Sequence, residues 1–193
     1  MSTDKRVIKT RNSIKTAFMQ LTMEREKEKI TVSDIADKAV INRSTFYLHY
    51  KDVMAVVNDI EKEIAAKISS CIESFDTGDL YGSTYTMFTS ITSMFDEEEA
   101  LKKYIVFSKD SENVAGRLKE IIIEKVTTAI SEDFDGVEKR AAVYPITFAA
   151  AGIVETYISW ERSGENIKPF NEITDEVSKY TEYIIKNITE NRS

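Results

Sequence analysis

The sequence predicts an all-α protein of about nine helices. Only 6 of its 193 residues are glycine and 2 are proline, while 31% are charged, as is typical of chains built from helices. Apolar side chains also recur three and four residues apart along most of the chain, the spacing of one helix face. One cysteine and one histidine leave no disulfide framework and no Cys/His metal site, so no metal or cofactor is expected.

The segment from Ile30 to Lys51 predicts two short helices joined by a tight corner. Thr31 can cap the first helix, and Asp34 stands three residues later, where a capping box places its acidic residue. After the corner, Asn42 can cap the second helix. Two short helices in this order predict a helix-turn-helix, in which the second helix enters the DNA major groove.

The second helix of this segment has two different faces. Phe46 and Tyr50 are four residues apart and share an aromatic inner face. The outer face is rich in hydrogen-bond donors: Arg43, Ser44, Thr45 and Tyr47. A solvated helix has no need of such a set, whereas a DNA groove does.

The charge is divided in a way that fits nucleic-acid binding near the N-terminus. The whole chain has a net charge of −7, but residues 1–55 carry 11 Lys and Arg against 7 Asp and Glu. Residues 56–193 carry 15 basic against 26 acidic side chains. The basic excess therefore lies where the helix-turn-helix is expected, as phosphate binding requires.

The segment resembles the tetracycline-repressor (TetR) family, whose common pattern reads roughly T-V-x-D-I-A-x-x-A-G-V-S-x-x-T-x-Y-x-x-F-x-x-K. The match covers about the first quarter of the chain. It implies a three-helix DNA-binding domain over residues 1–56, joined by a long helix to a helical ligand-binding and dimerisation domain over residues 57–193. The later helices resemble the subgroup typified by dihydroxyacetone-kinase regulators.

Two departures from the family pattern matter for the DNA contacts. Val40 replaces the turn glycine, and a left-handed backbone would be costly for a β-branched residue. The corner is then either built in allowed backbone space or strained. Val53 replaces the lysine at the start of the fourth helix, and Lys51 can substitute for its phosphate contact.

The DNA contacts are predicted in two sets. Base edges are expected to be read by Arg43, Ser44 and Thr45, together with Ser33 of the preceding helix. Arg43 is the strongest of these because its guanidinium can take guanine O6 and N7 together. Phosphates are expected at Thr31, Tyr47, His49 and Lys51, the tyrosine and histidine by the family resemblance. For His49 a purely solvated position stays open.

The remaining helices follow from their apolar lines. The first is expected over about residues 4–23, through Ile14 and Phe18, and would cover the two short helices. Its early basic residues are either solvated or, by the resemblance, beside the DNA backbone: Lys5, Arg6, Lys9 and Arg11. Asp52 should cap a fourth helix ending near Phe75. Further helices are expected over about 79–95, 96–107, 111–130, 137–163, ended by Gly164, and from 171 onwards.

The body is predicted to bind a small molecule and a second copy of the chain. A pocket is expected among Tyr85, Phe88, Tyr104 and Phe107, although such residues more often belong to a plain core. Residues from about Ala141 to Trp160 and from Glu172 to Ile188 resemble the family's four-helix dimer interface. Completion of the monomer core by these two helices is the open alternative.

These observations favour a homodimeric transcription regulator that binds a palindromic operator in double-stranded DNA. Repression relieved by an effector is the expectation, and a regulator or coactivator controlled by a protein partner is the alternative. An enzyme is not expected, because His49 and Cys71 stand alone on different helices. No signal peptide or membrane-spanning run is recognisable, so a cytoplasmic protein is expected.

Overall fold

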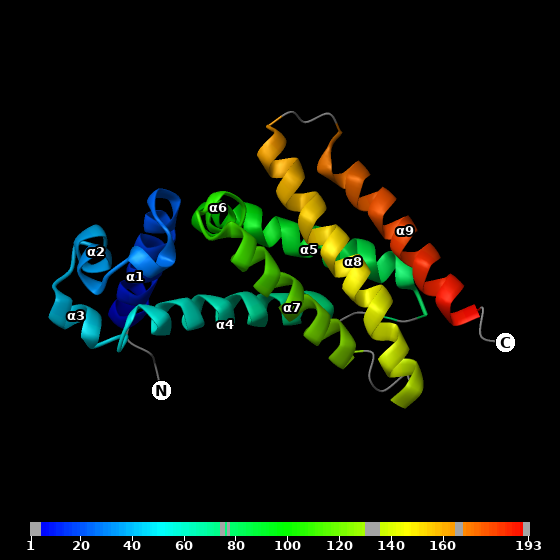
Figure 1. Cartoon of the computed structure of the whole chain (residues 1–193), viewed down its shortest axis with the longest axis horizontal. Coiled ribbons are helices and arrows are strands. Elements are labelled where there is room, and N and C mark those ends of the chain that lie inside the picture. Colours follow the sequence, from blue (N-terminus) through cyan, green and yellow to red (C-terminus); the bar gives the residue numbers. More distant parts are fainter. Residues whose placement is uncertain (1–4, 74–75, 77, 130–135, 165–167, 191–193) are drawn as a thin grey trace. The chain divides into compact units, whose positions relative to one another are not determined.

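The computed structural model describes residues 5–73, 76, 78–129, 136–164 and 168–190, with the backbone alone for 80, 129, 136–142 and 184–190. Within these ranges the chain is helical and has no strand, so the all-α prediction is confirmed (Figure 1). The elements are α1 (Lys5–Glu24), η1 (Lys27–Lys29), α2 (Val32–Lys38), α3 (Arg43–Tyr47), α4 (Val53–Ile72), α5 (Leu80–Glu97), α6 (Glu99–Phe107), α7 (Ser111–Ala129), α8 (Gly136–Ser163) and α9 (Phe170–Glu190).

The chain folds as two compact units. One consists of Met1–Ile64 with Glu98–Val114, and the other of Ala65–Glu97 with Ala115–Ser193. Helix α4 starts in the first unit and ends in the second. The first unit therefore contains α6 and the start of α7 in addition to the helix-turn-helix.

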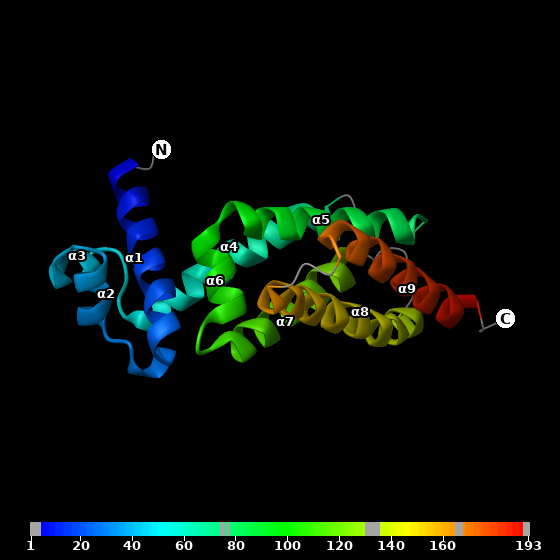
Figure 2. The ribbon, with the colours of Figure 1, turned by 90° about the horizontal axis from the view of Figure 1, so that it is seen from above.

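The core of the first unit forms where α1 covers α2 and α3, which lie beside it in both views (Figures 1 and 2). Ile14 and Phe18 of α1, Ile35 of α2 and Phe46 of α3 are all fully buried. Helix α6 packs on α1 as well, where the rings of Phe18 and Tyr104 meet edge to face at 6.0 Å between centroids. The two short helices are thus stabilised by burial against a longer one.

Local signals in the sequence set several helix ends. The Asp34 N–H donates to Thr31 Oγ1 at 3.2 Å and the Thr31 N–H donates to Asp34 Oδ2 at 2.8 Å, which completes the predicted capping box. Asp52 Oδ1 accepts from the Ala55 N–H at 2.7 Å and caps α4. Gly164 has a φ of 60° directly after α8, as expected of a residue that ends a helix.

The second unit packs α5, α7, α8 and α9 with the last turns of α4. Its buried side chains include Ile68, Phe95, Ile122 and Tyr157. Helix α9 lies against α5 and α8, and α8 and α9 run side by side (Figures 1 and 2). Pro145 lies inside α8 rather than at its start. No helix in the described part of the chain combines the length and apolarity needed to span a membrane.

Helix α9 buries a face that its apolar pattern does not predict. Among residues 170–183 of this helix, Thr174, Ser178 and Thr181 are buried, and the hydroxyls of the two threonines donate to carbonyl oxygens four residues earlier in the same helix. Tyr180, on the apolar line, is 67% exposed. The predicted interface residues Ala141, Ile184, Ile185 and Ile188 have side chains outside the described set.

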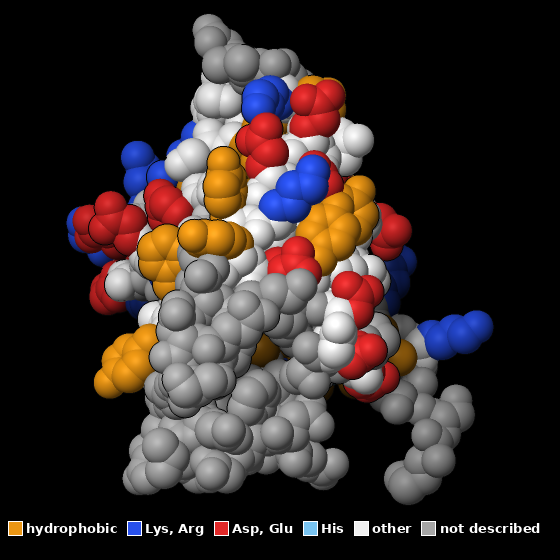
Figure 3. All heavy atoms as spheres, turned by 90° about the vertical axis from the view of Figure 1, so that its right-hand side faces the viewer, with side chains coloured by type: hydrophobic (Ala, Val, Ile, Leu, Met, Phe, Trp, Pro, Cys, Tyr) orange, Lys and Arg blue, Asp and Glu red, His pale blue; other side chains and the backbone are white. Residues whose placement is uncertain are grey.

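Large aromatic side chains are exposed on both α8 and α9. Tyr144 and Phe148, one turn apart on α8, are 79% and 64% exposed, and Tyr183 on α9 is 67% exposed. On the face drawn in Figure 3, apolar side chains reach the surface among carboxylates and basic groups. Side chains of this size are normally covered in a helical bundle, so Tyr144 and Phe148 give α8 an exposed apolar surface.

Candidate nucleic-acid interface

Helix α3 presents its polar side chains outwards because one aromatic residue anchors it from within. Phe46 is fully buried and its ring packs against those of Tyr47 and Tyr50 at 5.7 and 6.0 Å between centroids. Arg43 and Ser44, at the first turn, are exposed. Neither makes a side-chain hydrogen bond or ion pair to another described residue. Both are therefore available to a ligand.

The turn between α2 and α3 is a Schellman motif with valine in the glycine position. The Ile41 N–H donates to the Ala36 carbonyl at 2.9 Å, and the Val40 N–H donates to the Asp37 carbonyl at 3.2 Å. These two bonds hold Val40 at a φ of 55°, a conformation that is costly for a β-branched residue. The corner is therefore strained. The sequence had left open whether it is strained or built in allowed backbone space.

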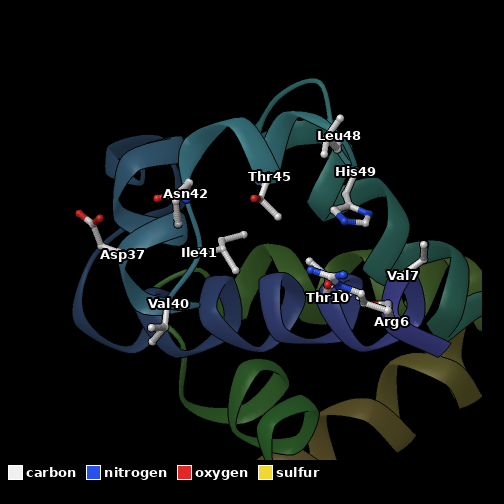
Figure 4. A pocket seen from close by; sticks show the side chains of 11 residues that line it. Arg6, Val7, Thr10, Asp37, Val40, Ile41, Asn42, Thr45, Leu48 and His49 are labelled. Carbon is white, nitrogen blue, oxygen red and sulfur yellow. Dashed lines mark hydrogen bonds between the residues drawn. The ribbon is translucent and has the colours of Figure 1, made fainter. Parts of the chain in front are cut away.

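An open groove of about 920 Å³ lies between α3, the turn and the N-terminal half of α1. In Figure 4, Arg6 and Thr10 of α1 lie across the groove from Thr45 and His49, and Ile41 lines its floor. The complete lining is Arg6, Val7, Thr10, Ala36, Asp37, Val40, Ile41, Asn42, Thr45, Leu48 and His49. A concave surface with donors from two helices is suited to contact an anionic backbone.

The eight predicted DNA-contacting residues all lie in the first unit, on or beside α2 and α3. Ser33 is exposed on α2, and Thr45 and His49 are half-buried in the groove wall. Tyr47 is 51% exposed. The Lys51 side chain is 82% exposed, with its ammonium group 4.0 Å from Asp52.

Thr31 is already engaged. Its hydroxyl donates to Asp34 Oδ2 at 2.6 Å and accepts from the Asp34 N–H. The hydrogen bond from the Thr31 hydroxyl is the largest cause that lowers the pKa of the Asp34 carboxyl, followed by the bond from the Thr31 N–H. A phosphate at Thr31 would have to displace this hydrogen bond, so the contact predicted there carries a cost.

Arg6 and Arg11 of α1 have different surroundings. Arg6 lines the groove and faces α3 (Figure 4). Arg11 instead pairs with Asp59 of α4, at 2.7 Å between Nη2 and Oδ1. Of the two, Arg6 therefore borders the groove, whereas Arg11 is directed towards α4. Sequence reasoning could not separate them, because the partner of Arg11 is 48 residues away.

Leu48 is a candidate that the sequence analysis missed. It follows α3 directly, lines the groove and is 82% exposed, an unusual position for a leucine in a small domain. An exposed apolar side chain beside base-reading residues can contact the methyl group of thymine. The sequence contains a signal for its exposure, because Leu48 does not lie on the inner face that Phe46 and Tyr50 share.

The four residues predicted to line an effector pocket are distributed over both units. Phe88, buried, and Tyr85, half-buried, lie on α5, whereas Tyr104 and Phe107 lie on α6 in the first unit. Tyr104 is buried against Phe18, and burial raises the pKa of its phenol. Phe107 is 49% exposed. The pocket among these four residues stays a prediction.

The described helices of the first unit, with the exposed face of α3, form a helix-turn-helix. No protein-family model matches the chain. The sequence is 35% identical over 66 residues to an uncharacterized HTH-type transcriptional regulator, YxbF, of Bacillus subtilis (strain 168). This match covers 34% of the chain but only 17% of that relative's length.

Solved structures similar to the whole chain are also regulators. The dihydroxyacetone kinase operon activator DhaS has a TM-score of 0.54 at 19% identity, over 92% of this chain and 96% of its own. The fatty acid degradation regulator FadR from Bacillus halodurans has a TM-score of 0.60 at 12% identity, over 94% of this chain and 96% of its own. The resemblance stated from the sequence is confirmed for the fold, including the body.

Proposed function

We propose that the protein is a sequence-specific DNA-binding transcription regulator of the TetR type. The observation that carries this proposal is the exposed start of α3, where Arg43 and Ser44 make no side-chain bond to another described residue and stand beside a donor-lined groove. Helix α3 would enter the major groove, with Arg43 on a guanine and Ser33, Ser44 and Thr45 on neighbouring base edges. Residues 1–56 would form this DNA-binding domain and residues 57–193 the regulatory one.

Phosphates would be held around the base-reading helix. Tyr47, His49 and Lys51 lie at or after its C-terminal end, and Arg6 and Thr10 approach from α1 across the groove (Figure 4). Leu48 would lie against the bases between these polar contacts. The proposed partner is double-stranded DNA that carries a palindromic operator, and the proposed location of the protein is the cytoplasm.

A homodimer through α8 and α9 is part of the proposal. Two DNA-binding domains must reach half-sites roughly 34–36 Å apart or a multiple of that, which a symmetric dimer provides. The choice of α8 and α9 as the interface is supported by the packing of α9. This helix buries Thr174 and Ser178 within the monomer and leaves Tyr180 exposed to solvent. The exposed Tyr144 and Phe148 of α8 extend the apolar surface that a second copy would cover.

The regulatory input is proposed to be a small molecule bound in the body, with repression as the default action. An apolar cavity of about 30 Å³ lies among side chains that include Met87, Ile122 and Ile153. That volume accommodates about one water, so an effector would have to open the body further. The small volume of this cavity favours the second candidate, in which a protein partner controls the regulator or recruits it as a coactivator.

Selection of DNA from a random-sequence duplex library tests the proposed function. The full-length chain should enrich one palindromic sequence, and sedimentation in the absence of DNA should give a dimer at micromolar concentration. The same library passed over a non-binding control protein gives the background. Sequence-specific binding would be refuted if the chain enriched no sequence above that background. A monomer that still enriches a half-site would refute only the dimer.

A further inference from the structure

Five side chains from three segments form a charged cluster behind the recognition helix. Tyr50 donates its hydroxyl hydrogen to Asp59 Oδ2 at 2.6 Å, and Arg11 Nη2 donates to Asp59 Oδ1 at 2.7 Å. The Arg11 guanidinium also lies over the Tyr50 ring, 4.8 Å from its centroid. Lys15, one turn further along α1, pairs with Glu63, one turn further along α4.

The cluster is neutral and mutually satisfied. Burial raises the pKa of Tyr50, as does its bond to Asp59, so the phenol stays protonated and donates. Burial would raise the pKa of Asp59, but the bond from Tyr50 and the charge of Arg11 outweigh it, and the net shift is downwards. The Asp59 side chain is only 20% exposed, so solvent screens these interactions weakly.

Tyr50 connects this cluster to the DNA-reading surface. Its N–H donates to the Phe46 carbonyl at 3.0 Å, so it continues the last turn of α3. Helix α3 has five residues, and Phe46 is the one that it buries. A helix this short has little stability of its own, so its orientation depends on what holds its ends. The Tyr50 hydroxyl ties one end to α4.

Position 50 is a tyrosine in this chain. The family pattern quoted above has phenylalanine at the position of Tyr50, and phenylalanine could fill the same space without the hydroxyl bond. Packing alone therefore does not explain the tyrosine. The hydroxyl adds a bond whose acceptor lies on the helix that continues into the other unit.

We infer that Asp59 is a positioning residue for DNA recognition, which fixes α3 through the Tyr50 hydroxyl while Arg11 orients its carboxylate. The inference rests on the proposed function, because α3 is taken as the base-reading helix. Since Asp59 lies on α4, this hydrogen bond joins the end of α3 to α4 within the first unit. Arg11 acts here within the protein rather than on a phosphate.

The full-length variants Tyr50→Phe and Asp59→Asn test this inference. Tyr50→Phe should bind the duplex selected by the wild-type protein about tenfold more weakly, the scale of a lost hydrogen bond to a charged group. Affinity for a random duplex of equal length, and its salt dependence, should not change. Amide hydrogen exchange over residues 43–50 should become about tenfold faster. The double variant should bind no more weakly than Asp59→Asn alone, because the Tyr50 hydroxyl acts through Asp59, whereas Asp59→Asn also weakens the pair with Arg11.

Tyr81→Phe is the matched control. It removes another short tyrosine–aspartate bond, from Tyr81 to Asp175 at 2.5 Å, in the other unit. This variant should alter neither the exchange of residues 43–50 nor the preference for the selected duplex. If Tyr50→Phe only lowers the melting temperature, with DNA preference and exchange as in the wild type, the inference is overturned. A wild-type protein that selects no sequence would refute the proposed function, and the exchange comparison would still decide the positioning role.

Discussion

Replacing Val40 with glycine should stabilise the protein, although valine is the larger and more apolar residue. Val40 is 90% exposed, so its side chain contributes almost no buried area. Its φ of 55° is imposed by the two hydrogen bonds of the turn, which need only the backbone. The substitution therefore removes strain and loses no packing.

The expected gain follows from two opposing free energies. A non-glycine residue in the left-handed region costs roughly 1–2 kcal/mol, and β-branching places valine towards the upper end. Glycine in turn makes the unfolded chain more flexible, which costs about 0.5–1 kcal/mol. The net prediction is a gain of about 0.5–1 kcal/mol in the free energy of unfolding. For a chain of this length that corresponds to roughly 1–4 °C in melting temperature.

Chemical denaturation of the wild type, Val40→Gly and Val40→Ala at one protein concentration measures this difference. Alanine keeps the Cβ atom and therefore most of the strain, so it should gain less than glycine. The reasoning is wrong if glycine lowers the unfolding free energy, or if alanine stabilises as much as glycine does. Equal protein concentrations matter because dimerisation contributes to apparent stability.

Three further outcomes are expected from other parts of the molecule. Thr31→Ala should lower the unfolding free energy by about 1 kcal/mol through loss of the helix cap, measured by denaturation. Tyr180→Glu should give a monomer by sedimentation, whereas Ile8→Glu, at a similarly exposed apolar position on α1, should stay dimeric. The stability advantage of the wild type over Asp59→Asn should be complete at about pH 6 and shrink as pH falls below the ordinary pKa of 3.8, because folding lowers the pKa of Asp59. An advantage that grows on acidification would contradict the assigned direction.

The parts of the fold that depend on short-range spacing could be predicted from the sequence. Thr31 and Asp34 are three residues apart, and their capping box formed as expected. The end of α8 at Gly164 is also set locally, because glycine takes a positive φ without a steric penalty. The all-α class and the helix order likewise follow from periodicity and breakers.

Other features depend on residues that are distant in the sequence and could not be predicted. The buried face of α9 consists of Thr174, Ser178 and Thr181, which read as a polar face until their packing is known. Threonine can be buried there because its hydroxyl bonds to its own helix. No sequence pattern indicated the Tyr50–Asp59 hydrogen bond either, because an aromatic residue on an inner helix face is expected to make apolar contacts.

The comparison of Arg43→Ala with Lys51→Ala tests the central claim, that α3 reads base sequence, most directly. Both variants should be measured on the selected duplex and on point-substituted versions of it over a range of salt concentrations. Arg43→Ala should cost about 1–3 kcal/mol on the selected duplex and relax specificity at one base pair. Lys51→Ala should weaken binding to all duplexes alike and reduce the salt dependence by about one phosphate contact. If Arg43→Ala instead weakens selected and random duplexes equally, α3 is not the base-reading helix.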